Sequence, residues 1–225
     1  MAQKLFYMVR HGESILNAAH IRQGSDGGLS EKGKDQAVAT GERLRSITFD
    51  VVLASPYERT RETAEIIMRS VKSRKPIEFI DLLVERRNPS EIVGKSADDP
   101  QIKQIIDRID KSYHSDDFRF SDEENFIDLK KRARSLLTYL EQRPEQKILI
   151  VTHSIFLKMI AALIIRGDHL TSRKYNMLSV INTSSNASVT VCSYRGTILG
   201  DGAIGRFFFP LRWRWQLIAW DDDTK

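Results

Sequence analysis

The stretch that decides the fold is Lys4-Leu5-Phe6-Tyr7-Met8-Val9-Arg10, which is followed directly by His11-Gly12. A short, largely apolar run of this kind predicts a β-strand that ends where the polar residues begin. Two further apolar runs, residues 49–54 and 147–152, have the continuous pattern of strands that are covered on both faces. Helical patterns alternate with these strands. The alternation predicts an α/β fold, a three-layer α/β/α sandwich with a mainly parallel sheet.

The other elements are expected from periodicity and from residues that begin or end helices. Ser30 is predicted to cap a helix over residues 31–46, and Ser55-Pro56 is predicted to open a helix to about residue 69, with Ser55 as its N-cap. Ser154 is predicted to cap the helix that follows residue 152. The remaining predicted elements are strands at 77–80, near 188–194 and near 213–220, and a helix over 129–140.

Length and composition predict one domain over residues 1–225, because the chain shows no internal repeat and no low-complexity linker. Within it, the polar stretch 89–126 with an amphipathic segment at 102–109 is interpreted as an insertion that covers a site. The first residues lack the apolar core of a signal peptide, and the single cysteine, Cys192, fits a reducing compartment. A cytoplasmic protein without membrane association is therefore expected.

The net charge of +5 favours acidic partners only weakly. Basic residues are scattered along the chain, which argues against a dedicated nucleic-acid surface. Basic and aromatic residues interleave over 206–215, and a terminal strand with alternating faces is the favoured interpretation. The basic helix face at 130–134 is likewise expected to be solvated. The oligomeric state is not predicted.

Polar residues stand directly after three of the predicted strands. They are Arg10-His11-Gly12, residues 55–59 and His153. In parallel α/β sheets, ligands bind outside the carboxyl ends of the strands. Two histidines and two arginines are therefore expected to meet at one edge of the sheet.

The order of these motifs resembles that of the histidine phosphatase (phosphoglycerate mutase-like) superfamily. A lone Arg-His-Gly tripeptide would be weak evidence, whereas an ordered set over most of the chain is specific. The matching segments are residues 9–14, Asn17, residues 29–33, residues 55–60, Glu85, residues 152–154 and residues 215–221. The resemblance implies a phosphoglycerate mutase-like fold and phosphoryl transfer.

The resemblance also implies a role for each matching residue. His11 is the nucleophile that becomes phosphorylated, and it can attack only as a neutral imidazole, because a protonated ring has no free lone pair. Arg10 and Arg59 are phosphate ligands with planar forks that match phosphate oxygens. His153 stabilises the charged transition state. Gly12 and Asn17 complete the phosphate site, Gly12 by letting the backbone approach phosphate closely.

Glu85 is the candidate proton donor, and a carboxyl group near phosphate is expected to have a raised pKa. Residues 86–90 depart from the Gly- and Trp-containing stretch common in the family, so Glu13 and Glu91 stay open as alternatives. Candidate substrate contacts are Gln23, Gly24, Arg86, Arg87 and Ser154, although Arg86 and Arg87 also fit a solvated pair. His20, His114 and His169 are interpreted as surface residues, and neither a metal nor a cofactor is expected.

These features predict a histidine acid-type phosphatase, a phosphomonoester hydrolase whose partner is a small phosphorylated substrate. Two alternatives remain open. One is a cofactor-dependent phosphoglycerate mutase, which is disfavoured because Ile15-Leu16 precedes Asn17 where the mutases carry a Trp-containing stretch. Arg86 fits a mutase as well. The other is a catalytically silent binding module.

Overall fold

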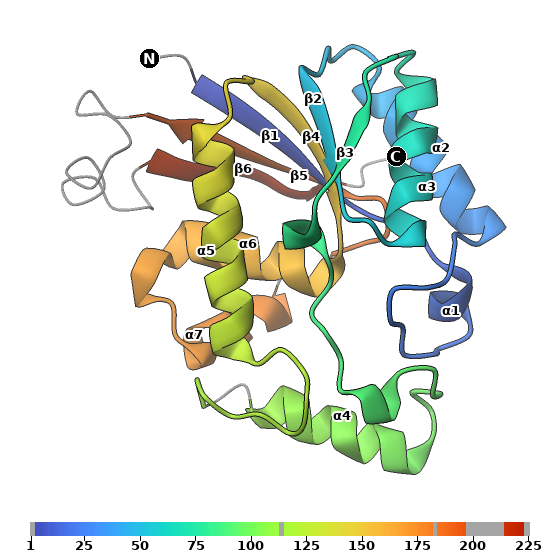
Figure 1. Ribbon diagram of the computed structural model, residues 1–225, viewed down its shortest axis with the longest axis vertical. Helices are drawn as coiled ribbons and strands as arrows, with labels where there is room; N and C mark the ends of the chain where they lie inside the picture. Colours follow the sequence, from blue (N-terminus) through green and yellow to red (C-terminus); the bar gives the residue numbers. More distant parts are fainter. Residues whose placement is uncertain (1–2, 113–114, 182–183, 197–213, 223–225) are drawn as a thin grey trace.

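A six-stranded sheet forms the middle of the molecule in the computed structural model, which describes residues 3–112, 115–181, 184–196 and 214–222. The strands lie in the order β3-β2-β4-β1-β5-β6 (Figure 1). Their bounds are β1 Gln3–Arg10, β2 Val51–Ala54, β3 Ile77–Phe79, β4 Lys147–Thr152, β5 Val189–Arg195 and β6 Trp215–Asp222. All six predicted strands are present, with ends that differ from the predictions by a few residues.

Strands β1 to β4 are parallel, and their register brings their carboxyl ends together. Arg10 at the end of β1 pairs with Thr152 at the end of β4, and Ala54 at the end of β2 pairs with Val151. The residues that follow these strands therefore start from adjacent positions at one edge of the sheet. This arrangement confirms the mainly parallel sheet.

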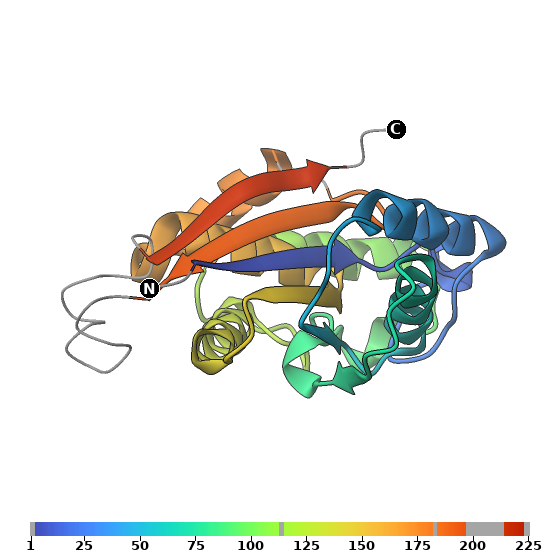
Figure 2. The ribbon, with the colours of Figure 1, turned by 90° about the horizontal axis from the view of Figure 1, so that it is seen from above.

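Strands β5 and β6 extend the sheet in the antiparallel sense. β5 pairs with β1, and β6 pairs with β5. Figure 2 shows β6 and β5 (red and orange) continuing the sheet beyond β1 (blue). Of the basic and aromatic stretch 206–215, residues 206–213 lie outside the described residues, and β6 begins at Trp215, whose side chain is buried.

Helices cover both faces of the sheet, as alternate strand residues show. Met8, Leu53 and Ile150 belong to one buried cluster with apolar residues of α5 and α6. Their neighbours Val9, Val52 and Val151 belong to a second cluster with residues of α2 and α3. The bounds of these helices are α2 Glu31–Leu44, α3 Glu58–Ser70, α5 Phe126–Gln142 and α6 Ser154–Arg166. The three-layer α/β/α sandwich is thereby confirmed.

Two of the predicted helix caps are wrong, while Ser30 does cap α2. α3 is capped at Tyr57, because the backbone N–H of Ser55 still continues the sheet by donating to Val151 O at 3.0 Å. α6 is capped at His153, and Ser154 is its first helical residue. α5 starts three residues earlier than predicted, at a capping box formed by Asn125 and Asp128.

The predicted insertion contains a helix, α4 Pro100–Ser112, and a short 3-10 turn, η2 Ser90–Ile92. Its first part is tied to the loop after β1, since Arg22 N–H donates to Lys95 O at 2.9 Å and Ala97 N–H donates to His20 O at 2.8 Å. α4 consequently lies at the end of the molecule toward which the parallel strands point (Figure 1). The remaining elements are α1 Ile15–Ala18, α7 Ser172–Ile181, and the 3-10 turns η1 Asp81–Leu83 and η3 Gly167–His169.

Candidate active site

Residues from three strand ends come together at the carboxyl edge of the sheet. His11, directly after β1, donates its backbone N–H to Thr152 O at 3.0 Å. The rings of His11 and His153 lie 5.1 Å apart between centroids in an edge-to-face arrangement. His153 Nε2 lies 2.9 Å from Ser55 Oγ, directly after β2, and Tyr57 packs on the His153 ring with centroids 5.1 Å apart. The predicted convergence of both histidines is present.

The surroundings of His11 favour a neutral ring with one free nitrogen. His11 is 4% exposed, and its Nδ1 lies 2.7 Å from Gly12 O. A carbonyl only accepts hydrogen bonds, so Nδ1 carries the proton and Nε2 carries the lone pair. Burial, followed by the charges of Arg59 and Arg10, lowers the pKa of His11 well below the ordinary 6.5. The ring is therefore a neutral base whose Nε2 is available for attack.

His153 is also held neutral. It is fully buried, and its pKa is lowered well below 6.5 by burial first and then by the charges of Arg59, His11, Arg132 and Arg10. Its Nδ1 is buried and has no hydrogen-bond partner among the described residues. An uncompensated polar atom of this kind is costly, which suggests that a ligand pairs with it.

The two predicted arginines border the histidines. Arg59 is 2% exposed, packs on the Tyr57 ring at 5.0 Å, and donates from Nη1 to Gly24 O at 3.1 Å and to Asp26 O at 3.4 Å. Its Nε has no partner in the described part of the chain. Arg10 donates from Nη1 to the carbonyl oxygen of Ser184. The charges of both cations lower the pKa of His11, and the same charges would attract a phosphate bound beside its ring.

Gly12 is closely packed within the protein, whatever its predicted role at the phosphate site. Its N–H donates to Thr63 Oγ1 at 3.1 Å, so it is engaged within the protein. A Cβ at Gly12 would lie 2.3 Å from Gly33 O, and one at Gly33 would lie 1.9 Å from Glu13 O. The two glycines thus allow the loop after β1 to pack backbone against backbone on the start of α2.

The loop after β1 supplies further polar groups. Asn17 Oδ1 is buried without a partner among the described residues. Gln23 Oε1 accepts from Ser14 Oγ at 2.8 Å, and Gly24 offers the carbonyl that orients Arg59. Asn17 therefore keeps unused hydrogen-bonding capacity, whereas Gln23 and Gly24 are engaged in holding the site.

Arg86 and Arg87 are not an equivalent solvated pair. The Arg86 side chain is 7% exposed, and its Nη1 lies 3.8 Å from Asp110 Oδ1 of α4. Arg87 is exposed and donates from Nε to Asp122 O at 2.8 Å. The structure thus places Arg86, and not Arg87, inside the molecule under the insertion.

Glu85 binds the beginning of α6. Its Oε2 accepts from the Ile155 N–H at 3.1 Å, and its Oε1 accepts from the N–H groups of Phe156 and Arg86, both at 2.9 Å. This carboxylate performs the capping role that was predicted for Ser154. Its charge also raises the pKa of Arg59, against the larger lowering by burial. Oε2 accepts only one of these N–H groups, so it keeps a lone pair that can carry the proton of a general acid.

The alternative carboxyl groups are less suited to donate a proton. Glu13 accepts from Lys32 Nζ at 2.9 Å and from Ser30 Oγ at 3.0 Å, and these hydrogen bonds, that from Lys32 first, lower its pKa. Glu91 is exposed, and a hydrogen bond from Ser121 lowers its pKa. Both groups are held in the ionised form.

The remaining histidines lie away from the site wherever they are described. His20 and His169 are exposed as predicted, and His114 lies outside the described residues. The described residues contain no group of three or more His, Cys, Asp or Glu side chains placed to hold a metal ion. Among the same residues, no helix combines the length and apolarity needed to cross a membrane.

Arg132 is the main functional candidate that sequence reasoning missed. The helix face at 130–134 was expected to be solvated, but the Arg132 side chain is 13% exposed and pairs with Glu124 at 2.7 Å. Lys130 donates to Asp168 O and Leu170 O, so it too is only partly solvated. An arginine on an amphipathic helix gives no sequence signal of burial when its partner lies in an irregular loop.

Comparisons with known proteins agree with this geometry. The family model of the histidine phosphatase superfamily (branch 1) matches residues 6–198. The chain is 29% identical over 166 residues to Probable phosphoglycerate mutase GpmB of Salmonella arizonae, which covers 71% of this chain and 74% of that protein. A stretch of 62 residues is 53% identical to the protein of the same name from Erwinia tasmaniensis, and it spans 27% of this chain and 29% of that protein.

Solved structures give the same fold. A mycobacterial glucosyl-3-phosphoglycerate phosphatase superposes with a TM-score of 0.74 at 21% identity, covering 97% of this chain and 99% of that chain. Identity at this level shows the fold alone. The family model, in contrast, matches most of this chain, and the matched range includes His11 and His153. The chain therefore belongs to the histidine phosphatase superfamily (branch 1).

Proposed function

We propose that the protein is a phosphomonoester hydrolase that acts on a small phosphorylated metabolite through a phosphohistidine on His11. The observation that carries this proposal is the buried His11 ring, with Nδ1 committed to Gly12 O and Nε2 free beside two arginines. A neutral nitrogen nucleophile next to fixed cations is what in-line attack on a phosphate dianion requires.

In the first step, Nε2 of His11 attacks phosphorus, a bond forms between nitrogen and phosphorus, and the bond from phosphorus to the leaving oxygen breaks. Arg10, Arg59 and His153 bind the non-bridging oxygens, where negative charge is concentrated. Asn17 adds a hydrogen bond. The carboxyl group of Glu85 gives its proton to the leaving alkoxide as a general acid, and an acid-type phosphatase is part of this proposal.

In the second step, the Glu85 carboxylate takes a proton from water, and the resulting hydroxide attacks the phosphohistidine. The nitrogen–phosphorus bond breaks, inorganic phosphate leaves, and His11 returns to its neutral form. The same residues serve both steps, so no cofactor is needed. The single-domain organisation, with the insertion at 89–126 over the site, and a cytoplasmic location in keeping with the single Cys192 are parts of this proposal.

The second candidate function is a phosphoglycerate mutase, and the names of the two curated relatives favour it. A mutase must retain and reorient a bisphosphorylated intermediate, whereas a hydrolase needs only access for water. The buried Arg86 would suit a second anionic group in either case. The name of the mycobacterial phosphatase adds glucosyl-3-phosphoglycerate to the substrates worth testing.

The two functions are separated by incubating the protein with p-nitrophenyl phosphate and, separately, with 3-phosphoglycerate plus its bisphosphate primer. We expect release of inorganic phosphate without isomerisation. Isomerisation far faster than phosphate release would contradict the hydrolase proposal and favour the mutase. If neither reaction occurs and no phosphohistidine forms, the protein is a binding module on this fold.

A further inference from the structure

The segment from Leu82 to Glu85 follows β3 and pairs with none of the strands that the structure describes. Its carbonyl groups are nevertheless all hydrogen-bonded. Leu83 O accepts from Thr152 Oγ1 at 2.7 Å, and the carbonyls of Leu82, Val84 and Glu85 accept from Arg132 at 3.1, 2.7 and 3.3 Å. One side chain of α5 thus takes the place of a neighbouring strand for the backbone that leads to Glu85.

The guanidinium of Arg132 is itself fixed on every side. Nη1 donates to the carbonyls of Leu82 and Val84, Nη2 to Glu85 O and to Glu124 Oε2, and Nε to Glu124 Oε1, so all five N–H groups are engaged. The two bonds to Glu124 measure 2.8 and 2.7 Å, and both side chains are largely buried. Bidentate pairs of this kind combine strength with fixed geometry.

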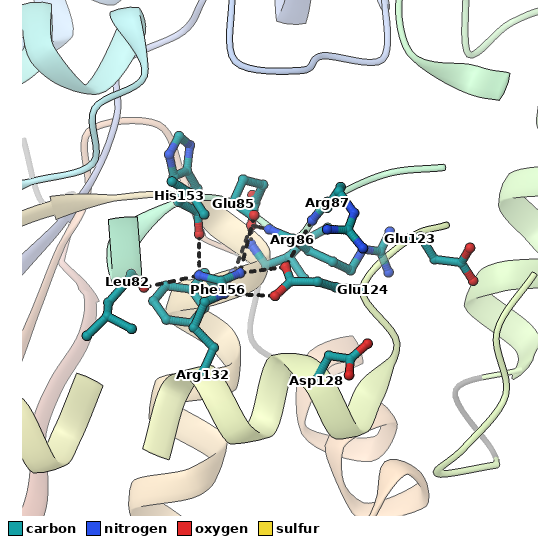
Figure 3. Close-up of polar contacts among 12 residues, drawn as sticks. Leu82, Glu85, Arg86, Arg87, Glu123, Glu124, Asp128, Arg132, His153 and Phe156 are labelled. Atoms are coloured by element: carbon teal, nitrogen blue, oxygen red, sulfur yellow. Dashed lines mark hydrogen bonds and ion pairs between the residues drawn. The ribbon is translucent and has the colours of Figure 1, made fainter. Parts of the chain in front are cut away.

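The same network reaches the carboxyl group of Glu85 from its other side. The guanidinium carbon of Arg132 lies 4.0 Å from the centroid of the Phe156 ring, and the Phe156 N–H donates to Glu85 Oε1. Figure 3 shows Arg132 meeting Leu82, Glu85 and Glu124, with Phe156 beside the guanidinium. The backbone of Glu85 is therefore held by Arg132, and its side chain is held by the helix on which Arg132 packs.

The loop after Glu85 also belongs to this hydrogen-bond network, through Arg87 and Glu124. The Arg87 N–H donates to Glu124 Oε2 at 3.0 Å, and the Glu124 N–H donates to Arg87 O at 3.1 Å. Glu124 stands at the end of the predicted insertion, directly before the cap of α5. The carboxylate of Glu124 thus joins the end of the insertion to Arg132 on α5 and to Arg87, two residues after Glu85.

We propose that Arg132, oriented by Glu124, is a positioning residue that fixes Glu85 for proton transfer. This inference rests on the proposed function, in which Glu85 protonates the leaving group. Arg132 does not touch the substrate in this scheme; it sets the place of the carboxyl group that does. A lysine keeps the charge but cannot serve five acceptors in one plane.

The test compares Arg132→Lys with Glu85→Gln on two substrates, p-nitrophenyl phosphate, whose leaving group needs little protonation, and glycerol 2-phosphate, whose alkoxide needs a proton. We expect Arg132→Lys to lower kcat/KM for glycerol 2-phosphate by about 100-fold, as a misplacement of about 1 Å does, and to change p-nitrophenyl phosphate hydrolysis only a few-fold. Glu124→Gln should act in the same direction, more weakly.

Non-additivity provides the second readout. The double variant Glu85→Gln/Arg132→Lys should be no slower on glycerol 2-phosphate than Glu85→Gln alone, because Arg132 acts through Glu85. Arg134→Lys is the matched control, since Arg134 lies on the same helix and pairs instead with Asp168. It should leave both substrates unchanged. Thermal unfolding of each variant shows that it is folded.

Three results would overturn the inference. Equal losses on both substrates for Arg132→Lys, in a folded protein, would mean that Arg132 only supports the fold. Multiplying effects in the double variant would mean that Arg132 and Glu85 act independently. If Glu85→Gln itself shows no preference between the substrates, the acid role of Glu85 in the proposed function fails, and the inference fails with it.

Discussion

His11 illustrates at the scale of a single residue how surroundings select a chemical state. Its nearest carbonyl, Gly12 O, decides which ring nitrogen carries the proton. Burial and the charges of Arg59 and Arg10 lower the pKa of the ring, so the ring stays neutral with a single N–H. The sequence indicated which histidine matters, because it stands between Arg10 and Gly12. The tautomer depends on the ring's rotamer, which no sequence pattern reports.

The lowered pKa of His11 has a direct consequence for pH dependence. A group whose pKa is depressed loses its proton at a lower pH, so His11 should stay neutral and competent as pH falls through 6.5, and lose competence only well below that value. NMR titration of the ring, assigned with His11→Asn, should show no protonation near pH 6.5. In Arg59→Gln, the pKa should rise but stay below 6.5, because burial is the larger cause. A midpoint at 6.5 in the unmodified protein would contradict this account.

At the scale of an element, α6 shows why helix ends are hard to predict. Its length and apolar face follow from the sequence, and so does its start just after the strand β4. Its capping group does not, because Glu85 is 70 residues away from Ile155 along the chain. The same applies to Arg132, whose backbone acceptors lie 47 to 50 residues earlier. Periodicity reports which face of a helix is apolar but not which distant polar groups meet its ends.

The corrected cap predicts different effects of two neighbouring substitutions on stability. Glu85→Ala removes an anionic acceptor from the N-terminus of α6 and should lower the free energy of unfolding by about 1–2 kcal/mol. Ser154→Ala should change the free energy of unfolding by less than about 0.5 kcal/mol, because a substitution that removes no capping bond and no core contact has a small effect. Urea denaturation measures both. A larger loss of unfolding free energy for Ser154→Ala than for Glu85→Ala would contradict this and support Ser154 as the cap of α6.

At the scale of the whole molecule, the register of the parallel strands assembles the central residues of the site. β1, β2 and β4 come from three distant parts of the chain, and their register places His11, Ser55 and His153 side by side. That convergence was predictable, because buried strands are recognisable and strand ends in such folds hold ligands. The insertion was predictable only as a polar stretch with one amphipathic segment. Its hydrogen bonds to the loop after β1 and to Arg87 are long-range contacts that leave no local pattern.

The account depends most on a covalent bond between phosphorus and His11, so trapping that bond is the most direct test. The protein is mixed with p-nitrophenyl phosphate, quenched within milliseconds in alkali, where phosphohistidine survives, and digested for mass spectrometry. We expect phosphate on His11 alone, and we expect both the label and the turnover to disappear in His11→Ala. Near-normal turnover by His11→Ala, or a label on another residue, would contradict the mechanism.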